Sequence, residues 1–282
     1  MFFMISGYLF FYNFKPTVKG WINKYKKRFK SLVIPFVIWC LGWMIVLYLV
    51  QLTSFGRMFF SNMIVSDFSI KQLFEYTFKY PIPFQLWYIS DLIKLVIISP
   101  IIYYLVRFLE KIYIPIIIVL CFINIINFPI IFFSLGCYMA LNYPKLNFKV
   151  NRSVFRLVVI GFLICSVLRV FTLNNINYIG ESLLAITRIL GILSIWFGYD
   201  FIAKGYDKVF KIAEYGIFIY FFHEPFQSFF YRIIFKLINK TEISQFILYF
   251  VAPILTIIIS VSIAIIFKRY MKNIYCILTG GR

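Results

Sequence analysis

The chain has 282 residues and a formal net charge of +19, and 62% of its residues are hydrophobic, 22% aromatic and only 14% charged. A soluble domain is closer to half apolar, with about a quarter of its residues charged, so this composition excludes an ordinary soluble protein. The positive charge is divided among short connections between apolar runs, and we therefore expect phospholipid headgroups, and not nucleic acid, as its counter-ions.

Nine apolar runs follow one another along the chain, and the connections between them alternate in charge. The runs cover 2–14, 32–52, 85–106, 112–127, 129–142, 157–173, 183–202, 213–235 and 245–267. Most of the 29 lysines and arginines lie in the connections 15–30, 107–111, 143–156 and 204–211 and in the tail from Lys268. Because positive connections favour the cytoplasm, we expect an all-α polytopic transmembrane bundle of about nine segments. It forms a single domain over residues 1–282 in the plasma membrane, with a cytoplasmic C-terminus.

The first apolar run is short for a membrane span. It ends at Lys15, whereas a spanning helix needs about 20 residues. The connection 15–30 is expected in the cytoplasm, so the run before it arrives from outside. We therefore expect a further helix ahead of Met1, which makes this domain N-terminally truncated.

Two later stretches follow from the same topology. The stretch 112–142 has basic residues on both flanks, so we expect two short spans hinged at Asn127–Phe128–Pro129, where proline cannot donate to a continuing helix. The polar interval 53–84, with its Pro81-Ile82-Pro83 break, is expected outside as a loop with one interfacial helix.

Four expected spans carry ionisable side chains, which are costly in lipid and mark candidate functional sites. These side chains are Asp91, Lys94, Glu181, Arg188, Arg169 and Arg232. Asp91 and Lys94 are three residues apart, so they share one helix face. Glu181 and Arg188 are seven apart and share another. The topology places both pairs in the outer half of the bilayer and predicts a polar cavity that opens outward. Snorkelling of these side chains to the headgroups is the alternative.

The only histidine of the chain, His223, precedes Glu224 and Pro225 in the run 213–235. Pro225 interrupts a helix, and the carbonyls freed at membrane depth need partners. Histidine is the common general base near neutral pH, so His223 and Glu224 are candidate catalytic residues. A histidine with a structural hydrogen bond is the alternative.

Five segments, in this order, resemble signatures of acyltransferase family 3, a family of integral membrane O-acyltransferases that includes bacterial sugar O-acetylases. They are the FFxxSG-like stretch Phe2–Leu9, the basic run Lys26–Pro35, Leu86–Ile89 with the later Ile98-Ser99-Pro100, the stretch Tyr215–Pro225, and the tail Leu278–Arg282. The tail is similar to that of the fucose 4-O-acetylase-like branch. Members have about ten helices, so the resemblance also implies that the first helix, which carries the arginine and histidine regarded as central to transfer, is absent here.

The resemblance implies transfer of an acyl group, most often acetyl, from acyl-CoA to a carbohydrate hydroxyl, without a metal. Arg28 and Lys30, together with Ser6, are the expected acyl-CoA contacts, because cationic groups at a helix start suit phosphates. The expected acceptor-binding residues are Asp91, Lys94, Glu181, Arg188 and Trp87, the last of which stacks on a sugar ring or belongs to an interfacial aromatic belt. The expected partners are membrane lipids and a carbohydrate acceptor.

Two other functions remain open from the sequence. Many helices, charges within spans and a broken helix at His223-Glu224-Pro225 are also typical of a transporter or of a flippase for a lipid-linked sugar. An inverted repeat would favour the transporter, and we find none. The third hypothesis is a non-catalytic remnant of such an acyltransferase. It is supported by the short first apolar run, which implies that the first helix is absent.

Overall fold

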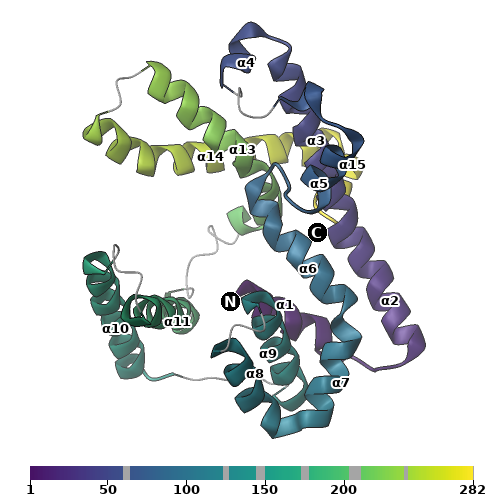
Figure 1. The fold of residues 1–282 in the computed structure, drawn as a ribbon, viewed down its shortest axis with the longest axis vertical. Helices are drawn as coiled ribbons and strands as arrows, with labels where there is room; N and C mark the ends of the chain where they lie inside the picture. The colour runs from purple at the N-terminus through teal and green to yellow at the C-terminus, as the bar shows by residue number, and fades with distance from the viewer. Residues whose placement is uncertain are drawn as a thin grey trace. The chain divides into compact units, whose positions relative to one another are not determined.

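The computed structural model describes residues 1–281 except 60–63, 123–126, 144–149, 173–177, 203–210 and 238–240. All regular structure formed by the described residues is helical, which confirms the predicted all-α class (Figure 1). The chain divides into two compact units, one made of residues 3–141 and 211–282 and the other of residues 142–210 with the first two residues. The single domain expected over residues 1–282 stays a prediction.

The larger unit contains most of the helices. In chain order they are α1 (Phe2–Phe11), α2 (Val18–Arg28), α3 (Ile34–Gln51), α4 (Ser54–Phe59), α5 (Ile70–Phe78), α6 (Trp87–Ile97), α7 (Ser99–Leu109), α8 (Tyr113–Phe122), α9 (Phe128–Asn142), α13 (Gly216–Leu237), α14 (Glu242–Tyr270) and α15 (Lys272–Leu278). One turn of π-helix, Phe29–Val33, joins α2 to α3, and we call it the π-turn. Short 3-10 turns cover Val65–Asp67, Phe84–Leu86 and Glu110–Ile112.

The smaller unit is a pair of helices, α10 (Arg152–Phe171) and α11 (Tyr178–Ile202), which lie side by side (Figure 1). Phe155 of α10 stacks on Phe201 of α11 with ring centroids 5.3 Å apart. The Asn151 side chain accepts a hydrogen bond from the Ser153 amide and so caps the start of α10.

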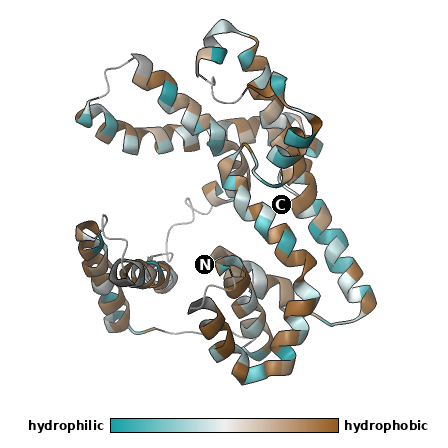
Figure 2. Cartoon of the chain, viewed as in Figure 1, coloured by the Kyte–Doolittle hydropathy of each residue, from teal (hydrophilic) through white to brown (hydrophobic). Residues whose placement is uncertain are grey.

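Among the described residues, four helical stretches are long and apolar enough to cross a membrane. They are Val18–Gln51, Arg152–Phe171, Ser182–Tyr199 and Glu242–Tyr270. A fifth candidate is a broken span, and α1 and α9 are apolar but shorter. Figure 2 shows apolar residues along most helices, whereas α2, in the basic connection, is largely hydrophilic. The chain is therefore an α-helical membrane bundle, as predicted.

The run 85–106, expected as one span, is broken. Its two parts, Phe84–Ile97 and Ser99–Ile117, are bent by 62°. Pro100 lies in the first turn of α7, where its missing N–H costs no hydrogen bond, and the Ser99 hydroxyl bonds the Val96 carbonyl at 2.6 Å. The Ser-Pro pair thus begins a second helix instead of ending the first.

Two other stretches are largely helical, and their predicted positions relative to the membrane stay predictions. In 112–142 the described residues form α8, up to Phe122, and α9, from Phe128. The interval 53–84 contains α4 and α5. Helix α5 is amphipathic and begins with a capping box, in which Ser69 and Gln72 each bond the other's backbone amide. It is the structural counterpart of the predicted interfacial helix.

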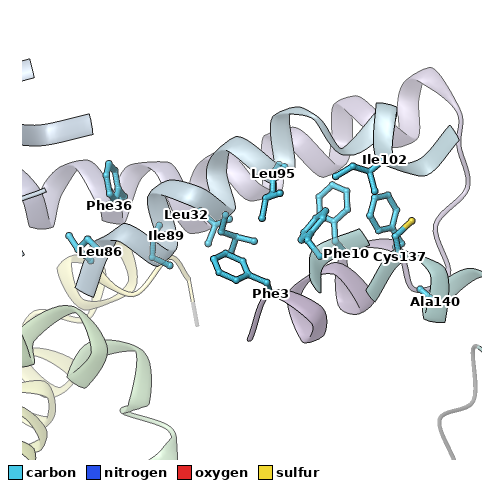
Figure 3. Packing of buried hydrophobic residues seen from close by; sticks show 14 of the residues in the cluster. Phe3, Phe10, Leu32, Phe36, Leu86, Ile89, Leu95, Ile102, Cys137 and Ala140 are labelled. Carbon is cyan, nitrogen blue, oxygen red and sulfur yellow. The ribbon is translucent and has the colours of Figure 1, made fainter. Parts of the chain in front are cut away.

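Buried aromatic and aliphatic side chains from α1, α3, α6, α7 and α9 form the core of the larger unit (Figure 3). Helices α1 and α9 touch through their backbones. A Cβ on Gly7 would overlap the carbonyl oxygen of Phe133, and one on Gly136 would overlap that of Met4. The glycine of the FFxxSG-like stretch is therefore needed for this close crossing, which fixes the position of Ser6 beside it.

Alanine at Gly7 or Gly136 is expected to force α1 and α9 apart and to destabilise the bundle by about 1–3 kcal/mol. Gly42→Ala in α3 is the control, because nothing lies within 4 Å of its added Cβ. The measurement is the thermal midpoint of the detergent-solubilised protein. Equal midpoints for all three variants would refute the close crossing.

Candidate functional site

A polar cluster lies where α1, α6 and α13 meet. The Ser6 hydroxyl is 2.9 Å from the Tyr88 hydroxyl, and the Tyr88 ring centroid is 6.3 Å from that of Tyr220. The Tyr220 ring is in turn 6.2 Å from that of His223. We call these four residues the hydroxyl cluster. Three of the five family-like segments, far apart in sequence, come together here.

Next to the hydroxyl cluster, helix α13 is interrupted. Glu224 has extended backbone angles, φ −114° and ψ 140°, and is followed by Pro225. The side-chain amide of Gln85 donates to the carbonyl of Glu224 at 2.7 Å and to that of Phe221 at 3.3 Å. Gln85 is only 8% exposed, and buried carbonyls require such donors. The Gln85 backbone carbonyl also accepts a hydrogen bond from the Tyr220 hydroxyl.

Gln85 is not among the site residues predicted from the sequence. The only available signal was a polar side chain at the very start of an apolar run, and such a residue ordinarily faces solvent. Its importance comes from a contact with residues that are 136 and 139 positions away in the chain.

The half-buried His223 ring is oriented by its own helix. Its Nδ1 lies 3.1 Å from the Ile219 carbonyl oxygen, and because a carbonyl only accepts, Nδ1 carries the proton. In the neutral ring Nε2 then has the lone pair that a general base needs. The Glu224 carboxylate turns away and accepts a hydrogen bond from the Ser228 hydroxyl at 2.9 Å. The structure therefore does not pair the two candidate catalytic side chains.

A cavity of about 830 Å³ lies between α2, the π-turn and α6, and we call it the basic cavity. Lys26, Lys27, Arg28 and Lys30 line it together with the apolar α6 residues Ile93, Val96 and Ile97. The lining surface is almost entirely apolar, so these four cations contribute mainly the hydrocarbon parts of their side chains. The Tyr25 hydroxyl donates to the Ile97 carbonyl at 3.2 Å and joins the two walls. Two of the three expected acyl-CoA contacts, Arg28 and Lys30, thus line one cavity.

The third expected contact, Ser6, lies in the hydroxyl cluster. The cluster and the basic cavity are at opposite ends of α6. At a rise of 1.5 Å per residue, Tyr88 and Ile97 are about 14 Å apart along this helix. Between them Asp91 and Lys94 form the predicted same-face pair, with Oδ1 and Nζ 2.8 Å apart. The two side chains are 32% and 63% exposed, so the pair is not buried within the protein.

The remaining predicted acceptor contacts are spread over both units. Trp87 is 46% exposed, and its ring centroid is 6.1 Å from that of Phe3. Arg188 is exposed on α11 of the smaller unit. The side chain of Glu181 lies outside the described residues. A joint outward cavity of these residues with Asp91 and Lys94 stays a prediction.

Comparison with known proteins gives one family. A family model described as an acyltransferase domain matches residues 1–265. Among curated proteins, the succinoglycan biosynthesis protein ExoH of Rhizobium meliloti (strain 1021) is 24% identical over 297 residues, which cover 99% of this chain and 77% of ExoH. No solved structure matches the chain significantly.

Replacing Gln85 is expected to destabilise the break in α13 in a pH-dependent way. In Gln85→Glu a carboxyl group would face two carbonyl oxygens, to which it can donate a hydrogen bond only when it is protonated. Since the folded state then binds the proton more tightly, the thermal midpoint rises relative to the wild type as pH falls from 8 to 5. Gln85→Met is the control, because methionine has no titratable proton. Its thermal midpoint is expected to be lower than that of the wild type by an amount that does not change with pH. Parallel curves for Gln85→Glu and the wild type would contradict this role.

Proposed function

The chain belongs to the acyltransferase domain family, and we propose that it moves an acetyl or related acyl group from acyl-CoA to a hydroxyl of a cell-surface or lipid-linked carbohydrate at the plasma membrane. The observation that carries the proposal is the basic cavity, an almost entirely apolar pocket whose lining residues include four that carry a cationic group, at the opposite end of α6 from the hydroxyl cluster. The role of the relative ExoH in succinoglycan biosynthesis supports a carbohydrate acceptor. Family membership favours this function over a transporter.

The basic cavity suits the phosphate end of the donor. Guanidinium and ammonium groups bind phosphate oxygens through strong charge-assisted hydrogen bonds, and Arg28 offers a planar fork for bidentate contacts. The apolar residues from α6 suit the uncharged parts of coenzyme A. The thioester is carried on a long flexible arm, so the phosphates and the reacting carbon occupy different places.

The hydroxyl cluster suits the reacting end. The acceptor hydroxyl gives its proton to Nε2 of His223, its oxygen bonds to the thioester carbonyl carbon, and the carbon–sulfur bond breaks. The departing thiolate takes up that proton, so the products are an ester and free coenzyme A, and His223 becomes neutral again. We assign the hydroxyls of Ser6 and Tyr88 to the acyl oxygen, where negative charge develops and donors are needed.

The acceptor is expected on the side of α6 that carries the exposed Asp91–Lys94 pair. Sugar hydroxyls need both hydrogen-bond donors and acceptors, and this pair offers both. The exposed ring of Trp87 offers a flat apolar face for a sugar ring. Arg188 and Glu181 remain proposed contacts from the smaller unit.

Removing either predicted phosphate contact is expected to weaken binding of coenzyme A. Arg28→Ala and Lys30→Ala should each raise the Kd about tenfold, which corresponds to about 1.4 kcal/mol. Lys19→Ala is the matched control, because Lys19 is exposed on the same helix but does not line the cavity. Calorimetry on the purified protein measures the three values. Similar losses for all three variants would mean a diffuse charge effect instead of a site.

His223→Gln is expected to lower kcat for acyl transfer about 100-fold or more while leaving coenzyme A binding unchanged, because the amide cannot act as a base. Its nitrogen can still donate to the Ile219 carbonyl, so the helix is not disturbed. Acetylation of an oligosaccharide acceptor by the purified protein measures the rate. An unchanged rate would remove His223 from the reaction.

A further inference from the structure

The C-terminal tail of the chain ends in a tight turn that lies against the π-turn. Helix α15 closes with two backbone bonds, from Gly281 to the Cys276 carbonyl at 2.7 Å and from Gly280 to the Ile277 carbonyl at 3.2 Å. This pattern is a Schellman motif, which requires a left-handed residue after the helix. Gly280 supplies it with φ +70°.

The residues that precede this turn are packed into the larger unit. The Trp39 indole nitrogen, from α3, donates to the Leu278 carbonyl at 3.0 Å. Tyr275 is 6% exposed and lies against Phe218 of α13, with ring centroids 5.9 Å apart. Thr279 is 2% exposed, and its hydroxyl bonds the Tyr275 carbonyl. The tail is therefore part of the buried structure.

Gly280 touches the π-turn directly. A Cβ at Gly280 would overlap the carbonyl oxygen of Ser31 and lie 2.8 Å from its Cα. Ser31 is the middle residue of the π-turn, and its neighbours Lys30 and Leu32 both line the basic cavity. A π-helical turn interrupts the regular hydrogen bonds of a helix and occurs frequently at functional sites. Such a turn depends on its surroundings to hold one conformation.

We propose that the C-terminal tail is a clasp that holds the π-turn in the conformation that binds the donor, with Gly280 as the positioning residue. The clasp acts through Ser31 on Lys30 and on the adjoining Arg28, and it does not touch the reacting atoms. This proposal rests on the proposed function, because it takes the basic cavity as the donor site. The tail residues take no part in the proposed acyl transfer, and the proposal gives them a structural role at the donor site.

The chain offers a matched pair of substitutions for the test. Gly280 and Gly281 both have left-handed φ values, +70° and +79°, so alanine adds comparable backbone strain at either position. Only Gly280 faces the π-turn, whereas a Cβ at Gly281 meets nothing nearer than the Cys276 sulfur at 4.0 Å. A difference between the two variants therefore reports the contact with Ser31.

The first readout needs no ligand. Hydrogen–deuterium exchange of residues 29–33 is expected to be at least several-fold faster in Gly280→Ala than in Gly281→Ala and the wild type. Equal exchange in all three proteins would overturn the clasp. If Gly280→Ala does not fold, Trp39→Phe removes the bond to Leu278 while keeping the aromatic ring, and the same acceleration is expected.

The second readout is coenzyme A binding. The Kd is expected to rise about tenfold in Gly280→Ala and to stay within twofold in Gly281→Ala, while the KM for the carbohydrate acceptor stays unchanged in both. Unchanged binding in Gly280→Ala despite faster exchange would also overturn the positioning role. If the wild type binds no coenzyme A but the exchange difference is present, the donor site is wrong and the clasp survives only as a structural contact.

Discussion

A helix that breaks inside an apolar bundle exposes backbone carbonyls that must find donors, and one side chain meets this requirement at the break of α13. The amide of Gln85 bonds two of these carbonyls, which ties the start of α6 to the middle of α13. The contact places Tyr88, Tyr220 and His223 beside one another. Most of what the site can do depends on this single junction, because it sets the position of the candidate base relative to the hydroxyls.

Helix α6 then separates the two halves of the proposed reaction. Its beginning belongs to the hydroxyl cluster, and its end is joined to the basic run by Tyr25. The chain bends at Ile98, between α6 and α7. Helix α6 therefore ends at Ile97, which lines the basic cavity. In the proposed reaction, a donor held by its phosphates at one end of α6 would extend toward the candidate base at the other end.

The sequence predicted the all-α membrane class, because a membrane span requires a long apolar run whatever its neighbours are. It also predicted Arg28 and Lys30 as one site, since clustered cations are visible without a structure. It could not predict the bend at Ser99-Pro100, because a proline near the end of an apolar run is equally compatible with the end of one helix and with the first turn of another. The partner of Gln85 and the direction of Glu224 depend on long-range contacts that no local pattern encodes.

The proposed reaction requires the donor phosphates and the reacting carbon to lie at opposite ends of α6. Photolabelling with two coenzyme A analogues, one reactive at the nucleotide and one at the acyl group, tests this directly by mass spectrometry of the modified peptides. Labels from the nucleotide analogue within 25–33 and 93–97, and from the acyl analogue within 3–11, 85–89 and 219–224, are the predicted result. Nucleotide labels confined to α10 and α11, or both analogues labelling the same peptide, would contradict it.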